Sequence, residues 1–342
     1  MGQGAIYPDL EGKAVIVTGG AGYIGSHAVK RLVEAGHKVT VVDNLYRGHK
    51  EAVHPSATFE ELDLLQTEAL ANLMTHRQIE CIMHFAALAY VGESVTQPLK
   101  YYENNTGGTL SLLQAAEVAG IKRFVFSSTC ATYGQPSSMP IIESMPQSPI
   151  NPYGWSKLFV ERILKDYASA HSDFAFAALR YFNVAGSASD GSIGEDHEPE
   201  THLIPVLLNV ALGKVPHATL FGEDYPTPDG TCIRDYIHVE DLVDAHIVVM
   251  QKLQPGEQRF YNLGIGRGYS VKEIVEAARK VTGHPIPVKI GPRRPGDPPS
   301  LFANADKIRT ELGWSAKHTD IREIIETAWR WFKAHPEGYA KP

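Results

Sequence analysis

The chain has 342 residues, of which 43% are hydrophobic and 21% are charged, and its formal net charge is −7. This composition is ordinary for a globular protein with one large domain or two smaller ones, and it provides no basic surface for nucleic acid. The 3 cysteines form no CxxC pair, which argues against a disulfide framework or a zinc ribbon. We see no signal peptide and no apolar run that could span a membrane, so we expect a cytoplasmic protein without a membrane partner.

Apolar strands and amphipathic helices alternate along the first half of the chain. The predicted strands lie in KAVIVTGG, HKVTVVDN, ATFEELD, ECIMHFAA, KRFVFSS and FAFAALRYFN. The predicted helices cover residues 23–35, 67–76, 98–119 and 152–170. This alternation predicts parallel strands joined by crossovers, with helices on both faces of the sheet. We therefore predict an α/β fold with a doubly wound parallel (Rossmann) sheet.

The alternation fades after about Gly186, where Gly, Pro, Asp and His become frequent. Helical patterns return at 239–253, 270–282 and 320–334. We expect a nucleotide-binding domain over 1–185 and a smaller mixed α/β substrate domain over 186–342. The chain is expected to cross back to the first domain around 235–265.

A glycine-rich turn, TGGAGYIG, joins the first predicted strand to the first predicted helix. Its glycines would let the backbone approach a pyrophosphate, which the free N–H groups at the start of the helix would bind. Asp43 ends the next strand, where a carboxylate accepts hydrogen bonds from a ribose diol and repels a 2′-phosphate. The pattern favours NAD, and nearby Arg47 leaves NADP open. Asp63 and Leu64 either flank an adenine or end a strand, and the small residues of HFAA allow either a cofactor or close packing.

A tyrosine and a lysine stand four positions apart in NPYGWSK, behind a proline that suits the start of a helix. Tyr153 and Lys157 would share one helix face, and the positive charge of the lysine would lower the pKa of the tyrosine. Such a tyrosine can take a proton from a sugar hydroxyl. The same spacing at Tyr46 and Lys50 encloses Gly48 in a loop-like stretch, so that pair is not expected to share a face.

Hydroxyl side chains end the fifth predicted strand in FSSTCATYG. Ligands of an α/β sheet bind beyond the carboxyl ends of its strands. Ser127, Ser128 and Thr129 would therefore either hydrogen-bond a reacting oxygen or only cap the strand.

Several of these motifs, taken in order, carry a resemblance over nearly the whole chain. They include VTGGAGYIGSH, HFAA, YYENN, FSST, NPYGWSK, LRYFNVAG, FGEDYPTPDGTCIRDYIHVEDL, YNLG and RRPGD. With them the chain resembles the extended short-chain dehydrogenases/reductases and, more specifically, the UDP-glucose 4-epimerase (UDP-galactose 4-epimerase) family. The resemblance implies tightly bound NAD, transient oxidation of a UDP-sugar at C4, and a homodimer built on helices near 98–119 and 153–170. In this scheme Tyr153 is the base, Lys157 orients the nicotinamide ribose, and Thr129 hydrogen-bonds the 4-oxygen.

The resemblance also implies the binding residues. Besides Tyr153 and Lys157, the implied NAD contacts are Gly19, Gly22, Tyr23, Ile24, Gly25, Asp43, Asn44, Asp63, Leu64, Phe85, Ala86, Ala87, Asn104, Ser127 and Tyr181. Besides Thr129 and Tyr153, the implied UDP-sugar contacts are Asn183, His202, Leu203, Phe221, Arg234, Arg294, Asp297 and Leu301. The chemistry agrees, because arginines suit a diphosphate and Phe221 could pack on uracil. Without the resemblance, Arg234 and Asp235 would read as a local ion pair.

The sugar is less well defined than the chemistry. Leu301 falls where relatives carry either a bulky tyrosine or a smaller cysteine, and this position limits the room at the sugar 2-substituent. Acceptance of N-acetylated sugars therefore stays open. HFAALAYVGES also resembles plant UDP-xylose/arabinose 4-epimerases, so a UDP-pentose is a further alternative. Relatives also carry a lysine where this chain has Ala89, so one cofactor contact is expected to be missing.

Two rival functions are disfavoured. A nucleotide-sugar 4,6-dehydratase needs an Asp-Glu pair after the threonine, and this chain has Cys130 and Ala131 there. A metal hydrolase could use His197 and His202 in GEDHEPETH, but no HExxH pattern is present. We expect that segment to be a solvated or substrate-side loop, and we predict no metal.

Overall fold

The computed structural model describes residues 12–294 and 297–339, and its chain divides into two compact units. The first unit consists of the chain up to Thr132, Asn151–Leu179 and Val243–Tyr261. The second consists of Tyr133–Ile150, Arg180–Leu242 and the chain from Asn262 onward. Each unit is thus built from segments that are far apart in the sequence.

A seven-stranded sheet forms the centre of the first unit, in the order β11-β6-β5-β4-β1-β2-β3. Its strands are β1 (Ala14–Thr18), β2 (Lys38–Asp43), β3 (Thr58–Glu61), β4 (Cys81–His84), β5 (Arg123–Ser127), β6 (Ala175–Arg180) and β11 (Gln258–Asn262). Neighbouring strands from β3 to β6 pair in parallel. From β3 to β6 the strand order is that of a doubly wound dinucleotide fold, so the predicted α/β class is confirmed.

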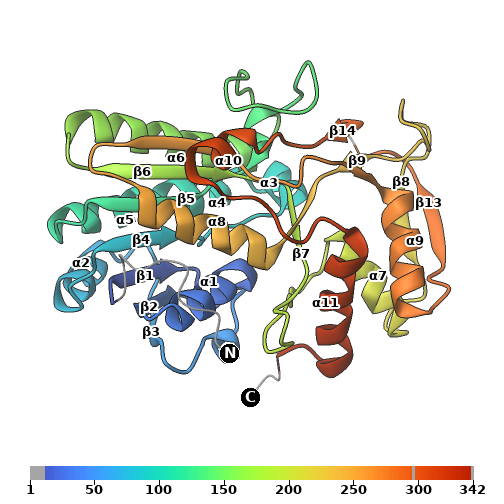
Figure 1. Ribbon diagram of the computed structural model, residues 1–342, viewed down its shortest axis with the longest axis horizontal. Helices are drawn as coiled ribbons and strands as arrows, with labels where there is room; N and C mark the ends of the chain where they lie inside the picture. Colours follow the sequence, from blue (N-terminus) through green and yellow to red (C-terminus); the bar gives the residue numbers. More distant parts are fainter. Residues whose placement is uncertain (1–11, 295–296, 340–342) are drawn as a thin grey trace. The chain divides into compact units, whose positions relative to one another are not determined.

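Helices cover both faces of this sheet (Figure 1). The helices of this unit are α1 (Tyr23–Glu34), α2 (Thr67–His76), α3 (Val91–Thr96), α4 (Pro98–Tyr101), α5 (Gly108–Val118), α6 (Pro152–Ala170) and α8 (Val239–Lys252). The apolar sides of α2, α5 and α6 form one core with alternate strand residues such as Ile16, Ile82 and Phe124. Helices α1 and α8 are joined by an ion pair, with Arg31 Nη2 2.8 Å from Asp244 Oδ1.

The predicted helix over 98–119 is not regular. Between α4 and α5 the chain forms a π-helical segment, η3 (Tyr102–Gly107). Asn105 is buried there, and its side chain contacts Leu88 N and O and Ser156 Oγ at 2.8–3.0 Å. These bonds tie η3 to Leu88, which follows β4, and to Ser156 of α6. The apolar periodicity that predicted one helix gives no indication of them.

Local sequence explains why α6 begins where it does. The Oδ1 atom of Asn151 accepts a hydrogen bond from Gly154 N at 2.8 Å, which caps the helix, and Pro152 occupies the first helical turn. Tyr153 and Lys157 therefore lie in the first two turns, at the end of α6 that follows the loop from β5.

The described residues of the second unit form three small sheets and a group of helices. Its strands are β7 (Asn183–Ala185), β8 (Ala218–Phe221), β9 (Ile233–Arg234), β10 (Tyr236–His238), β12 (Tyr269–Ser270), β13 (Val288–Gly291) and β14 (Ser300–Leu301). Its helices are α7 (Leu203–Ala211), α9 (Val271–Thr282), α10 (Asp306–Leu312) and α11 (Ile321–Ala334). A capping box between Ser270 and Glu273 starts α9, and α7, α9 and α11 pack against one another. No helix among the described residues is long and apolar enough to cross a membrane.

Candidate active site

The glycine turn joins β1 to α1 with almost no room for side chains. Gly19 has a φ of +74°, and a Cβ there would lie 2.5 Å from the backbone N of Ala86. A Cβ on Gly25 would overlap the carbonyl oxygen of Gly19. Gly22 caps α1, and Tyr23 and Ile24 form its first turn with Gly25. The turn therefore fits a dinucleotide, because phosphates can approach its backbone closely and the N–H groups at the start of α1 can bind them.

The carboxylate of Asp43 lies against this turn at the end of β2. Its Oδ2 accepts a hydrogen bond from Ala21 N at 3.0 Å, and its Oδ1 accepts one from Leu45 N at 2.9 Å. Burial raises the pKa of Asp43, and these amides act in the opposite direction. Next to it, Asn44 Nδ2 donates to Asp63 Oδ2 at 2.7 Å. Asp43, Asn44 and Asp63 thus form one polar group beside the glycine turn.

The other predicted cofactor residues of the first unit lie at the ends of strands or beside them. Phe85, Ala86 and Ala87 directly follow β4, and the amides of Phe85 and Ala86 donate to Thr18 O at 2.9 and 3.0 Å. Asn104 lies in η3. Leu64 is held by its carbonyl oxygen, which accepts a hydrogen bond from Ser111 Oγ at 2.5 Å. Tyr181, by contrast, is buried in the second unit.

Tyr153 and Thr129 are brought together. Their side chains share a hydrogen bond, although Thr129 lies in the loop after β5 and Tyr153 in the first turn of α6. Burial raises the pKa of Tyr153, and the hydrogen bond from Thr129 lowers it only in part. Lys157 is not among the groups that shift this pKa, so the expected lowering by the lysine is not seen in the described residues. The protein alone keeps the tyrosine neutral.

The Lys157 ammonium explains this difference, because it is turned toward the end of β5. Its Nζ donates to Ser127 O at 2.8 Å and lies 4.9 Å from the centroid of the Phe126 ring. The side chain is buried, and burial lowers its pKa from 10.5 to about 7. A lysine in this state can bind a hydroxyl in either protonation state, and a nearby anion would favour the charged one.

Two buried polar residues near this pair were not singled out from the sequence. Glu161 lies one turn after Lys157 on α6, and Ser128 Oγ donates to its Oε1 at 2.5 Å. Glu161 lies four residues after Lys157, a spacing that places both on one helix face and could have identified it from the sequence. His84 ends β4, with hydrogen bonds to threonine hydroxyls on both ring nitrogens. Burial and, to a smaller extent, Lys157 lower its pKa to about 3, so His84 is neutral at pH 7.

Tyr46 and Lys50, which have the same sequence spacing as Tyr153 and Lys157, contact different residues in the structure. The Tyr46 hydroxyl accepts a hydrogen bond from Lys100 Nζ at 2.9 Å. The Lys50 ammonium instead lies over the ring of Phe59, 5.2 Å from its centroid. These contacts confirm that Tyr46 and Lys50 do not act as a pair.

Five of the predicted substrate residues lie on three strands and one loop of the second unit. Arg234 Nη2 lies 2.6 Å from Asp297 Oδ1, and Leu301 pairs in register with Arg234. The guanidinium of Arg294 lies 4.0 Å from the centroid of the Phe221 ring. The structure therefore groups a cation–carboxylate pair with Leu301, and a second cation with an aromatic ring.

The neighbouring aspartate has a structural role instead of pairing with Arg234. Asp235 is buried, and its oxygens accept hydrogen bonds from Ile265 N at 3.1 Å and Ala303 N at 3.2 Å. Burial raises its pKa to about 7. Its carbonyl oxygen accepts a bond from the amide of Asn183, another predicted substrate residue, at 3.3 Å. The local Arg234–Asp235 ion pair considered from the sequence is therefore not formed.

His202 and Leu203 begin α7, and His202 faces two carboxylates. Its Nδ1 lies 3.0 Å from Glu195 Oε1 and 2.9 Å from Glu200 Oε1. Burial lowers the pKa of His202, but Glu195 and Glu200 outweigh it and raise the value to about 10. His197 faces the same two carboxylates, which raise its pKa to about 9 against the effect of burial. The loop is thus a compact charged cluster, so the solvated alternative expected from its sequence is wrong, and the substrate-side alternative stays a prediction.

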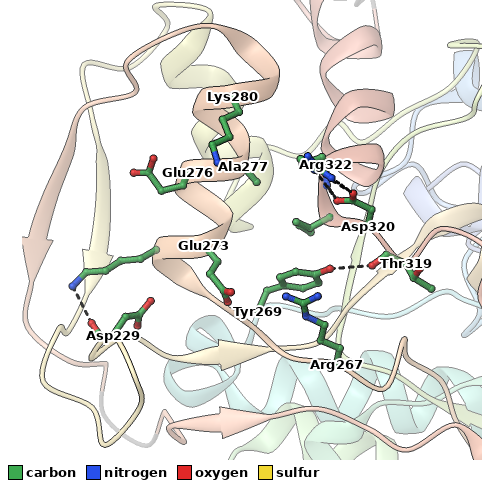
Figure 2. A pocket seen from close by; sticks show the side chains of 12 residues that line it. Asp229, Arg267, Tyr269, Glu273, Glu276, Ala277, Lys280, Thr319, Asp320 and Arg322 are labelled. Carbon is green, nitrogen blue, oxygen red and sulfur yellow. Dashed lines mark hydrogen bonds and ion pairs between the residues drawn. The ribbon is translucent and has the colours of Figure 1, made fainter.

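A pocket of about 690 Å³ opens beside α9 and the start of α11 (Figure 2). Its charged side chains are Asp229, Arg267, Lys272, Glu273, Glu276, Lys280, Asp320 and Arg322. Acidic and basic groups balance, and Figure 2 shows Arg322 paired with Asp320. None of the pocket residues is a predicted site residue, and the mixed charge favours no one class of ligand.

Comparisons with known proteins agree with this geometry. Residues 15–264 match the NAD dependent epimerase/dehydratase family. The chain is 52% identical over 326 residues to the UDP-glucose 4-epimerase of Lactobacillus helveticus, covering 95% of this chain and 98% of that protein. It is 48% identical over 338 residues to UDP-arabinose 4-epimerase 1 of Arabidopsis thaliana, covering 95% and 80% of the two chains. Its fold matches the crystal structure of the Bifidobacterium longum UDP-glucose 4-epimerase in complex with NAD+ and UDP, with a TM-score of 0.92, 38% identity, and coverage of 96% and 100%.

Proposed function

Because the chain belongs to the NAD dependent epimerase/dehydratase family, we propose that it interconverts UDP-glucose and UDP-galactose by transient oxidation at the sugar C4. The observation that carries this proposal is that Thr129 is the hydrogen-bonding partner of Tyr153, and that both lie in the same unit as the buried Lys157 and the glycine turn. The high identity to UDP-glucose 4-epimerases supports the choice of sugar nucleotide.

NAD fits the residues present. The glycine turn would hold the pyrophosphate, Asp43 the adenosine ribose, and Lys157 the nicotinamide ribose. Asn44, Asp63, Leu64, Phe85, Ala86, Ala87, Asn104, Ser127 and Tyr181 are proposed as further contacts. When bound, NAD would accept hydride from C4, return it to the other face, and add a positive charge that favours tyrosinate.

The chain's own residues would then move one proton. Tyr153 accepts the proton of the sugar 4-hydroxyl, and Thr129 holds the 4-oxygen by a hydrogen bond. Neutral His84, at the end of β4, adds no second cation to the charge of Lys157. The proton returns from Tyr153 when the other epimer forms, so the cycle needs no outside acid or base.

The second unit would hold the UDP moiety. Arg234 and Arg294 suit the diphosphate, Asp297 a ribose, and Phe221 the uracil ring. Asn183, His202 and Leu203 are proposed as additional contacts, and Leu301 as the side chain that limits the sugar 2-substituent. A 4,6-dehydratase is disfavoured because Cys130 and Ala131 follow Thr129 and neither is a carboxylate.

The direct test uses purified protein without added nucleotide. We expect it to release NAD on denaturation and to convert UDP-glucose and UDP-galactose into each other. UDP-N-acetylhexosamines and UDP-pentoses are assayed in parallel, and a faster pentose reaction would replace the proposed substrate. Strict dependence on free NADPH, with a reduced product, would reject the epimerase assignment.

We also propose a homodimer that uses the outer sides of α4–α6. Leu99, Val118 and Phe159 are large apolar residues with 80%, 75% and 42% exposure, and such residues favour burial against a partner. A Phe159→Asp variant should then be monomeric by light scattering while wild-type protein is a dimer. A wild-type monomer would reject this part of the proposal.

The expected setting is the cytoplasm, with a role in galactose metabolism. All 3 cysteines are free and buried, which suits a reducing compartment. Fractionation of cells that express the chain at its natural level would test the location. Loss of growth on galactose after deletion would support the role.

A further inference from the structure

Figure 1 shows the chain between β7 and α7. Four potential metal ligands lie there within eight consecutive positions. They are Glu195, His197, Glu200 and His202, and one ligand atom from each lies within 4.8 Å of all the others. All four belong to the second unit, and Glu195 is 4% exposed. The cluster is therefore a local chelate that needs no residue from another segment.

The spacing of the ligand atoms fits a four-coordinate ion. Zinc binds nitrogen and carboxylate oxygen at about 2.0–2.2 Å, so neighbouring corners of its tetrahedron lie about 3.3–3.6 Å apart. His202 Nδ1 lies 3.0 Å from Glu195 Oε1 and 2.9 Å from Glu200 Oε1. His197 Nδ1 lies 3.2 Å from Glu195 Oε1 and 3.6 Å from Glu200 Oε2. Shifts of a few tenths of an ångström would bring these four distances to the tetrahedral values, and the other two pairs of ligand atoms lie within 4.8 Å.

The cluster has too few N–H donors for the carboxylates that approach its imidazole nitrogens. Each imidazole Nδ1 carries at most one N–H, yet both carboxylates approach both Nδ1 atoms. One proton serves one acceptor well, whereas a divalent cation at the centre serves all four groups at once. The two carboxylates also balance its charge.

The residues around the cluster hold its ligands in place. Glu200 Oε1 accepts hydrogen bonds from the amides of Thr201 and His202, both at 2.7 Å. Asp196 points elsewhere and accepts a bond from Tyr339 N at 2.9 Å, while Gly194 N donates to the Tyr339 hydroxyl at 3.0 Å. Bonds of this kind orient metal ligands and set their affinity.

We propose that Glu195, His197, Glu200 and His202 bind one divalent transition-metal ion, with zinc as the best match to the donor set. Imidazole nitrogen suits zinc and its neighbours, whereas calcium and magnesium take oxygen ligands. Four protein ligands leave no open position, so the ion is structural and fixes the loop that leads into α7. It leaves only Nε2 of His202 available to a substrate.

A second group of potential ligands provides the control. His238, Glu240 and His318 also lie close together. The ring nitrogens of His238 are already used, because Nε2 contacts Thr327 Oγ1 at 2.9 Å and Nδ1 accepts from Glu240 N at 3.1 Å. A His318→Asn variant should therefore leave metal binding unchanged.

The test measures zinc binding by the full-length protein with its NAD in place. Protein treated with a chelator and then desalted is titrated with Zn²⁺ against a chromogenic chelator, and bound zinc is counted by mass spectrometry. We expect one zinc per chain. His197→Ala and Glu200→Gln should each weaken binding by more than the roughly 10–100-fold that loss of an outer contact costs. Glu200→Gln keeps an acceptor for the two amides, so it removes a ligand while preserving the loop.

Two further measurements distinguish zinc bound at this site from zinc bound elsewhere on the protein. Zinc should raise the melting temperature of wild-type protein and of His318→Asn, but not that of Glu200→Gln. Cobalt in place of zinc should give the visible bands of a four-coordinate nitrogen–oxygen site without thiolate charge transfer. Absence of zinc binding at micromolar concentrations, equal binding by Glu200→Gln and wild type, or a thiolate band from one of the cysteines would each overturn the proposal.

Discussion

Replacement of Lys157 by methionine should stabilise the protein while it removes the activity. The Lys157 side chain is 3% exposed, and burial lowers its pKa from 10.5 to about 7. An unfolded chain therefore binds a proton at this position over a range where the folded chain does not. Between pH 7 and 10.5 the lysine destabilises the fold, and this cost grows as the pH falls.

The size of the effect follows from these two pKa values. The cost is about 4 kcal/mol at pH 7 and about 2 kcal/mol at pH 9, a mean slope of about 1 kcal/mol per pH unit. Methionine also loses the hydrogen bond to Ser127 O, which offsets about 1–2 kcal/mol of the gain at every pH. We therefore expect Lys157→Met to be more stable by about 2–3 kcal/mol at pH 7 and about equal to wild type at pH 9.

The assay is urea unfolding of both proteins, freed of bound dinucleotide, at several pH values from 7 to 10. The difference in unfolding free energy between the variants isolates Lys157 from all other titrating groups. Its slope with pH is the decisive quantity, because the lost hydrogen bond shifts the difference only by a constant. A difference that does not change between pH 7 and 9 would show that the pKa of Lys157 is not depressed, and the reasoning would fail.

Three other substitutions test the site. Tyr153→Phe should lower turnover by about 10²–10⁴-fold, as expected for loss of an acid–base group, while NAD stays bound; near-normal turnover would exclude Tyr153 as the base. Gly25→Ala should abolish NAD retention, because its Cβ would overlap Gly19 O, and full NAD content by absorbance after denaturation would contradict this. Leu301→Tyr should reduce kcat/KM for UDP-N-acetylhexosamines about 10-fold or more relative to UDP-hexoses, by steric exclusion. An unchanged ratio would place the selectivity elsewhere.

Local sequence patterns predicted the features of this protein that depend on interactions between residues near in sequence. The helix at 152–170 was predictable because Asn151 and Pro152 suit its first turn and its apolar residues recur on one face. The shared face of Tyr153 and Lys157 followed from the same periodicity. The glycine turn could be placed because only glycine permits so close an approach between the backbones of Gly19 and Ala86.

Other features depend on contacts that no local pattern encodes. The π-helical segment around Asn104 depends on Asn105, whose partners lie in two other segments. The pairing of Arg234 with Asp297 joins residues more than sixty positions apart and displaced the simpler pairing with Asp235. The convergence of Glu195, His197, Glu200 and His202 requires an irregular loop conformation, which neither a period of 3.6 nor one of 2 describes.

The strand β11 has a consequence for how the protein is made. It covers the outer edge of β6, a strand whose residues are all buried, yet it is translated only after about half of the second unit. At about 5–20 residues per second, the ribosome needs on the order of 10 s to reach Gln258 after it has completed Arg180. During that interval the edge of β6 is unpaired on the nascent chain and can pair with strands of other chains. Slow codons between these two strands would lengthen that exposure, so synonymous changes there should alter the yield of folded protein.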